Sequence, residues 1–270
     1  MAPRLAALLC LAAALPTASC GTGPTRLARP GPAAGSASSP DPRLSALQDA
    51  PGPPARIDYS AQTRLVRGWR VHIDRRLEQG SPDHPAGLGE LGARALELLD
   101  AKLLGAERAL PPQALARLKS VEIWLSLDSA AGPGAVYHPS AQWLSEHGFD
   151  PSKAGGLEIA NAANFLDWSR EQPAMVLHEL AHAYHHQVLG YDDASVRECF
   201  QRVRAAKSLD QVLHAGGRRE RAYALNNEQE FFAEMSEAWW GTNDYFPFVR
   251  AELAESFPEV AALMRSAWER

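Results

Sequence analysis

The stretch Met175-Val176-Leu177-His178-Glu179-Leu180-Ala181-His182 carries an H-E-x-x-H pattern inside an apolar segment. The apolar flanks predict a largely buried helix. Positions i and i+4 share one face of a helix, so His178 and His182 can bind one metal ion together. Glu179 lies beside that ion, where its carboxylate can take a proton from water. Two buried imidazoles and a buried carboxylate need partners, and a metal ion supplies them.

A catalytic zinc ion usually has three protein ligands and one open position, so one more ligand is required. A further histidine in the arrangement H-E-x-x-H-x-x-G-x-x-H is excluded. His185 stands at the glycine position of that arrangement, and Val188 stands at its last histidine position. A role for His185 at the surface or behind a ligand is favoured over ligation.

A glutamate from a second helix is the other route to a third ligand. Residues 227–240 offer Glu230, Glu234 and Glu237 at positions i, i+4 and i+7, on one helical face. Three acids on one face repel one another, and a cation relieves that repulsion. Most such runs are solvated acidic stripes, but Phe231 and its aromatic neighbours make this helix too apolar to be mainly solvated.

These residues resemble a known family. The pattern His178-Glu179-x-x-His182, followed by Tyr223 and then Glu230-Phe231-Phe232-Ala233-Glu234, resembles the zincin metallopeptidases of the gluzincin type. The likeness is to the peptidase domain of anthrax lethal factor and its relatives, and it covers about residues 170–240. It implies one Zn²⁺ ion held by His178, His182 and Glu230. It also implies that Tyr223, seven residues before Glu230, stabilises the transition state.

The chemistry that the resemblance implies is hydrolysis of peptide bonds. Glu179 acts as general base toward water, and the Tyr223 hydroxyl donates to the developing oxyanion. Glu234 either orients a ligand histidine or caps a nearby donor. Two other hypotheses stay open: a zinc hydrolase of another amide, such as a cell-wall peptide, and a non-catalytic, tethered zinc-binding domain that recognises a partner. The presence of both Glu179 and Tyr223 favours catalysis, because ligation alone requires neither.

The first twenty residues are typical of an export signal. Arg4 gives a short positive region, and Leu5–Leu15 is an apolar run too short for a stable membrane span. Thr17-Ala18-Ser19-Cys20 resembles a bacterial lipoprotein processing site, with Cys20 as the lipidated residue, although leucine is usual where Thr17 stands. We expect an extracytoplasmic protein anchored through Cys20. Ordinary signal cleavage, giving a secreted or periplasmic protein, is the alternative.

Residues 21–55 are dense in Gly, Pro, Ala and Ser, which predicts a disordered tether. Residues 56–270 are then long enough for one well-buried domain. Of the three cysteines only Cys199 falls in that domain, so no internal disulfide is expected and Cys199 should pack as a small apolar residue.

The charge balance excludes one class of partner. The chain has 27 basic and 32 acidic residues and a formal net charge of -5. No basic stripe stands out beyond Arg218–Arg221, so nucleic-acid binding is not supported. We expect a peptide or protein substrate, contact with a membrane only through Cys20, and a monomer.

Periodicity and breakers predict strands in the first part of the domain and helices in the second. The fold class expected is therefore α+β: a zincin-like fold with a small mixed sheet, an active-site helix and a mostly helical C-terminal part. The strand before the motif helix is expected to lie at the sheet edge and pair with substrate backbone. A long loop is expected over 132–151, with His138 at the substrate cleft. The strands are expected near 65–73, 121–127 and 157–160, and the helices near 88–104, 172–190, 194–206, 227–240 and 258–268.

Overall fold

The structure is a computed structural model that describes residues 56–59, 63–79 and 88–270. The predicted export signal (1–20) and tether (21–55) lie outside the described residues. Within them, no helix combines the length and the apolar character needed to cross a membrane.

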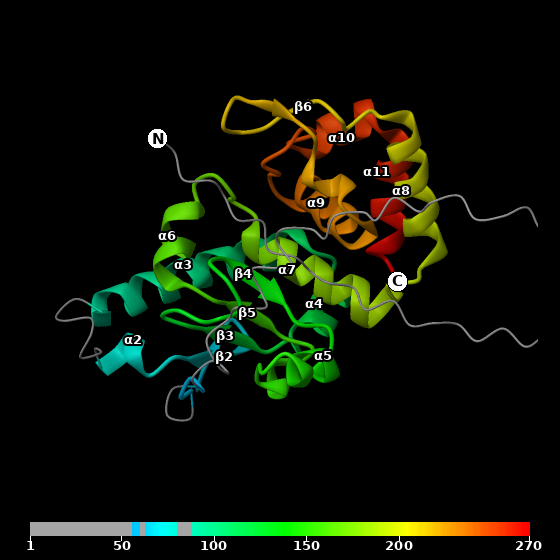
Figure 1. Cartoon of the computed structure of the whole chain (residues 1–270). Helices are drawn as coiled ribbons and strands as arrows, with labels where there is room; N and C mark the ends of the chain where they lie inside the picture. The colour runs from blue at the N-terminus through cyan, green and yellow to red at the C-terminus, as the bar shows by residue number, and fades with distance from the viewer. Residues whose placement is uncertain (1–55, 60–62, 80–87) are drawn as a thin grey trace, which may run out of the picture.

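A small mixed sheet forms one half of the domain (Figure 1). Its central strands β2, β3 and β5 run parallel, and β1 and β4 lie antiparallel at the two edges. The strands in spatial order are β1 (Thr63–Val66), β2 (Trp69–Ile73), β3 (Ile123–Leu125), β5 (Leu157–Ile159) and β4 (Ala135–Tyr137). A second pairing, β6 (Val212–Leu213) with β7 (Arg219–Glu220), lies in the other half of the domain.

Three sequence predictions about strands are wrong. The segment 65–73 is a hairpin and not one strand, because Arg67 and Gly68 both adopt positive φ and turn the chain. Residues 132–151 are not a continuous loop, because they contain β4 and a short helix. The strand before the motif helix, β5, does not lie at the sheet edge, because β4 pairs with its outer side. The edge strand next to the motif helix is β4.

The two faces of the sheet differ in chemistry because side chains alternate along each strand. On one face, Val71, Ile123 and Leu157 are fully buried in the apolar core that also contains the motif helix. The opposite face carries Trp124 and Glu158, which pair across β3 and β5. Gly156 precedes β5 on this face, where a Cβ atom would lie 2.1 Å from the Trp124 ring.

Helices surround the sheet and make up most of the C-terminal half. The confirmed fold class is α+β, with a small mixed sheet and a mostly helical C-terminal part. In Figure 1 the motif helix α7 crosses the middle of the molecule, between the sheet and the helices α9, α10 and α11. The helices are α2 (Arg76–Gln79), α3 (Leu88–Ala109), α4 (Pro112–Leu118), α5 (Ala141–Glu146), α6 (Ala162–Trp168), α7 (Met175–Tyr184), α8 (Ala194–Ala206), α9 (Glu228–Trp240), α10 (Arg250–Ser256) and α11 (Pro258–Ala267).

Local signals explain the limits of the helices that position the site. α7 continues as a π-helical turn, η2 (His185–Leu189), and the chain leaves it at Gly190, where φ is 84°. α9 begins after Asn227, whose side chain accepts a hydrogen bond from the Glu230 amide at 2.8 Å. Cys199 on α8 is buried in the core, as predicted for a small apolar residue.

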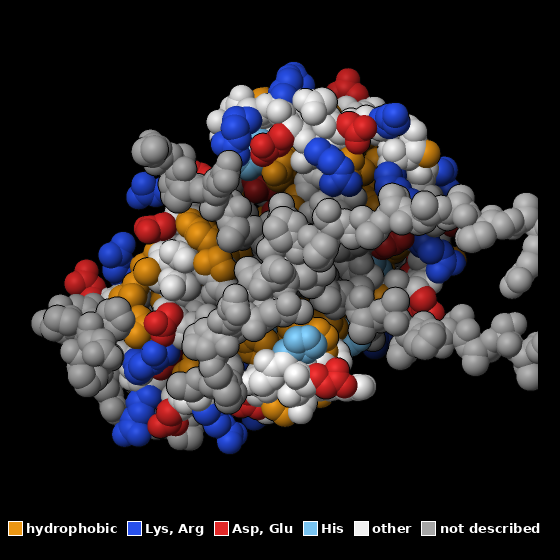
Figure 2. Space-filling view, viewed as in Figure 1, with side chains coloured by type: hydrophobic (Ala, Val, Ile, Leu, Met, Phe, Trp, Pro, Cys, Tyr) orange, Lys and Arg blue, Asp and Glu red, His pale blue; other side chains and the backbone are white. Residues whose placement is uncertain are grey.

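The visible surface shows no concentration of positive charge. In Figure 2, Lys and Arg side chains are interspersed with Asp and Glu over the described part of this face. This distribution agrees with the near balance of 27 basic and 32 acidic residues in the sequence.

Candidate metal centre

Three side-chain atoms from two helices converge on one point. His178 and His182 lie one turn apart on α7, and Glu230 lies in the first turn of α9, which packs against α7. His178 Nε2 lies 3.0 Å from His182 Nε2 and 3.1 Å from Glu230 Oε2. His182 Nε2 lies 3.3 Å from the same oxygen. The structure thus brings together the three residues that the sequence suggested as ligands.

The size of this triangle fits a zinc ion. Tetrahedral zinc holds nitrogen and oxygen ligands at about 2.0–2.1 Å, which places the ligand atoms roughly 3.3 Å from one another. The three observed separations are within a few tenths of an ångström of that value. The donor set of two imidazoles and a carboxylate is also one that zinc accepts.

The pKa shifts of His178 and Glu230 indicate which charge the site favours. Burial alone would lower the pKa of His178, but hydrogen bonds to Glu230 and Glu237 raise it well above its ordinary value. Burial would raise the pKa of Glu230, but the nearby His182 and His178 hold it well below its usual range. Both shifts show that the site favours positive charge next to the Glu230 carboxylate.

Glu237 is the acid that orients His178, and the sequence did not single it out for this role. Its Oε1 accepts from His178 Nδ1 at 2.6 Å, whereas the nearest Glu234 oxygen lies 3.9 Å from that nitrogen. A hydrogen bond at Nδ1 fixes the ring so that Nε2 faces the centre. Glu237 lies two turns after Glu230 on the same helix, and this spacing was the signal available in the sequence.

Glu234 and Asp244 complete a buried acidic group behind the ligands. Burial raises the pKa of Glu234 well above its usual range, and the nearby Asp244 and Glu237 raise it further. Burial also raises the pKa of Asp244, which the nearby His214 and His178 partly offset. Among the described residues Glu234 Oε2 has no hydrogen-bond partner. Burial and the neighbouring acids both favour the neutral form of the Glu234 carboxyl.

Glu179 faces the sheet edge. Its Oε2 accepts a hydrogen bond from the backbone amide of Tyr137 in β4 at 2.7 Å. The Tyr137 side chain contacts the π-helical turn. Gln187 Nε2 donates a hydrogen bond to the Tyr137 hydroxyl at 3.0 Å, and His186 Nδ1 lies 2.8 Å from that hydroxyl. Tyr137 thus joins the edge strand to both α7 and the π-helical turn.

The remaining candidates are Tyr223, His185 and His138. Tyr223 opens the short 3-10 helix η3 (Tyr223–Leu225), which packs against α9, and its half-buried side chain stays a predicted donor. His185 is fully buried against the rings of Phe232 and Tyr191. Burial, together with the nearby His182, lowers the pKa of His185 to about 3, so its ring is neutral. His138 does not line a cleft as predicted, because it is buried against Glu158.

Comparisons with protein families and with curated proteins found no match. Among solved structures, the chain is similar to the Pro-Pro endopeptidase PPEP-2 from Paenibacillus alvei, with 16% sequence identity and a TM-score of 0.40. The likeness covers 75% of this chain and 98% of that one. Because the similarity is this low, we infer function from the side chains of the centre alone.

Proposed function

We propose that this chain is a zinc-dependent peptidase. The observation that supports the proposal is the convergence of His178 Nε2, His182 Nε2 and Glu230 Oε2 within 3.3 Å of one another in a buried site. These three residues would hold one Zn²⁺ ion. Glu179 on the adjacent position of α7 supplies a carboxylate that ligation does not need.

When bound, the zinc ion would lower the pKa of a water molecule and polarise a carbonyl group. Glu179 serves as the general base that takes the proton from the attacking water. Its Oε2 is held by the Tyr137 amide, which fixes the carboxylate and leaves Oε1 to receive the proton. The same oxygen can then return the proton to the amine that leaves.

Tyr223 is proposed to donate a hydrogen bond to the oxyanion that forms from the substrate carbonyl. It sits on η3 immediately before α9, so the packing of η3 on α9 ties its position to that of Glu230. The peptide itself can lie along β4, because this edge strand borders α7. The Tyr137 amide is taken by Glu179, so an added strand would pair with the other outward main-chain groups of β4.

We also propose that the domain works outside the cytoplasm at the end of a tether. The apolar run Leu5–Leu15, the small residues before Cys20 and the Pro- and Gly-rich segment 21–55 support this placement. The substrate would then be a peptide or protein that reaches the membrane surface.

The test is digestion of a diverse peptide library by the purified, zinc-loaded protein, with the Glu179→Gln variant in parallel. Cleavage by the unmodified protein alone supports the proposal and gives the sequence preference. If a folded, zinc-loaded protein cuts nothing, the peptidase proposal is rejected in favour of another amide substrate or a recognition role.

A further inference from the structure

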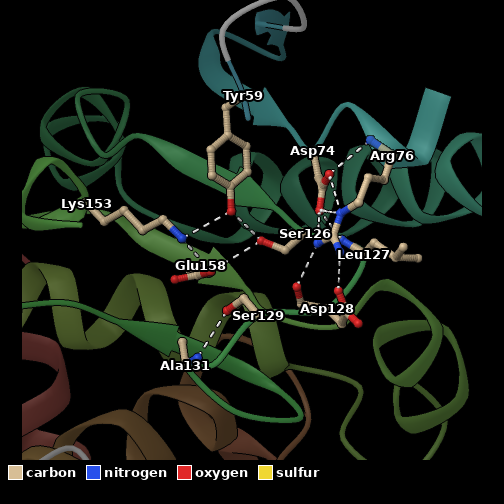
Figure 3. A network of polar contacts seen from close by, with 10 residues as sticks. All are labelled: Tyr59, Asp74, Arg76, Ser126, Leu127, Asp128, Ser129, Ala131, Lys153 and Glu158. Atoms are coloured by element: carbon tan, nitrogen blue, oxygen red, sulfur yellow. Dashed lines mark hydrogen bonds and ion pairs between the residues drawn. The ribbon is translucent and has the colours of Figure 1, made fainter. Parts of the chain in front are cut away.

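A buried polar cluster lies on the sheet face opposite α7, and its outermost member is Tyr59 (Figure 3). The Tyr59 hydroxyl lies 2.6 Å from Ser126 Oγ, and Lys153 Nζ donates to it at 3.1 Å. The Lys153 ammonium also lies 5.0 Å from the centre of the Tyr59 ring. Tyr59 belongs to the segment 56–59, which directly follows the predicted tether.

Glu158 is the centre of the cluster. It receives Lys153 Nζ at 2.6 Å, His138 Nε2 at 2.8 Å and Ser126 Oγ at 3.2 Å. Glu158 is 1% exposed, and Lys153 and His138 are 7% and 5% exposed. The stability of each buried charge in this cluster depends on all of its partners, because the loss of one partner leaves a desolvated charge unpaired. Tyr59 is one of those partners, through Lys153 and through Ser126.

The cluster is connected to the metal centre through the edge strand. His138 immediately follows β4, and its backbone pairs with the segment that leads into β5 (His138 amide to Gly156 oxygen, 2.9 Å). The residue before it, Tyr137, gives its amide to Glu179 of α7 at the open edge of the sheet. The end of β4 is therefore held from both sides, by Glu179 on the α7 side and by His138–Glu158 on the opposite side.

We propose that Tyr59 is a positioning residue for the active site, which acts by fixing the end of β4 through Lys153, Glu158 and His138. The inference rests on the proposed function, since it concerns the geometry of Glu179. Without the Tyr59 hydroxyl, Lys153 and Ser126 each lose a partner and the His138–Glu158 contact loosens. The Tyr137 amide then holds Glu179 less firmly, while the metal ligands on α7 and α9 stay in place.

The test uses the full, zinc-loaded chain with Tyr59→Phe, which removes the hydroxyl and keeps the ring. Amide hydrogen exchange at Ala135–Tyr137 should speed up selectively, and kcat for a cleaved peptide should fall about 10-fold at unchanged KM and zinc content. Ser126→Ala, which removes the other hydroxyl of the pair, should act in the same direction and serves if Tyr59→Phe does not fold.

Tyr184→Phe is the matched control. It also removes one buried phenol hydroxyl, but that hydroxyl bonds to the backbone of Ala267 and Arg270 at the C-terminus. Tyr184→Phe should lower thermal stability without a selective change in amide hydrogen exchange at β4. If Tyr59→Phe behaves as this control does, with lower stability and unchanged exchange at Ala135–Tyr137, the inference is wrong. Amide hydrogen exchange can be measured without cleavage of a peptide, so it tests the inference independently of activity. If the unmodified protein cuts no peptide, that result rejects only the proposed function.

Discussion

His178 donates through Nδ1 to Glu237 at 2.6 Å, so one helix, α9, supplies both the carboxylate that faces the metal centre and the carboxylate that orients a ligand histidine. Glu237→Gln keeps the shape of the side chain and removes its charge. We expect zinc affinity to fall roughly 10- to 100-fold, as measured by competition with a chromophoric chelator. Glu228→Gln, a half-buried glutamate at the start of α9, is the control and should leave affinity unchanged. Equal affinity of Glu237→Gln and the unmodified protein would contradict the role given to Glu237.

Glu179→Gln tests the proposed base. The amide oxygen of glutamine can still accept from the Tyr137 amide, so the fold around α7 should be preserved. We expect bound zinc to remain stoichiometric by elemental analysis while kcat falls by about 10²- to 10⁴-fold, because the side chain no longer takes a proton. Loss of zinc in this variant would show instead that Glu179 is a ligand.

Tyr223→Phe tests the proposed oxyanion donor. Removal of one such donor costs about 10²- to 10³-fold in kcat, and KM should change little because the contact forms mainly in the transition state. Steady-state kinetics on one cleaved peptide give both values. A variant with raised KM and normal kcat would place Tyr223 in substrate binding and not in the chemical step.

The Glu158 cluster predicts an acid-sensitive fold. Burial would raise the pKa of Glu158, but hydrogen bonds and charge from His138 and Lys153 lower it to about 2. A carboxyl whose folded pKa lies below its unfolded value stabilises the fold above the unfolded pKa, and this contribution is lost as pH falls toward 2. The stabilisation is on the order of 3 kcal/mol for a shift of this size. Urea unfolding from pH 5 to pH 2 should show a shallower loss of stability for Glu158→Gln than for the unmodified chain. Parallel pH profiles would contradict the assignment.

Cys20→Ala tests the membrane anchor. We expect the unmodified chain, expressed with its own N-terminus in a bacterium, to sediment with membranes and to incorporate labelled palmitate. The variant should do neither, because one covalent lipid group is the anchor proposed. Cys199→Ala is the control, since Cys199 is buried in the domain and should not affect fractionation. Membrane association that survives Cys20→Ala would exclude lipidation at this position as the anchor.

The sequence predicted the helices of the site well, because their signals are local. α8 has the predicted limits 194–206, and α9 begins one residue after the predicted start because Asn227 acts as its cap. The motif helix runs to Gly190 as predicted, although its last turn is π-helical. The i, i+4 spacing of the two histidines predicted that they share one face, but spacing left Glu230, Glu234 and Glu237 as candidate partners. The resemblance to the gluzincin pattern selected Glu230 among them.

The short strands were predicted poorly, because three-residue strands carry almost no periodicity. β4 is only Ala135–Tyr137, and it lies between turns in a segment that reads as a loop. Its place at the sheet edge is set by pairing with β5, a contact between segments distant in sequence. The contacts of Glu158 depend on the same pairing, so neither the Tyr137 amide as a partner of Glu179 nor the buried ion pairs could be inferred from spacing alone.

The reactivity of the Cys199 thiol can report on local opening of the folded part of the chain. Its side chain packs between α8 and the C-terminal helices, and burial raises the pKa of its thiol. A thiol reagent can react only when this region opens, and no other cysteine lies after residue 20. The rate of modification under native conditions therefore measures how often the helical half separates, without any label introduced by mutation.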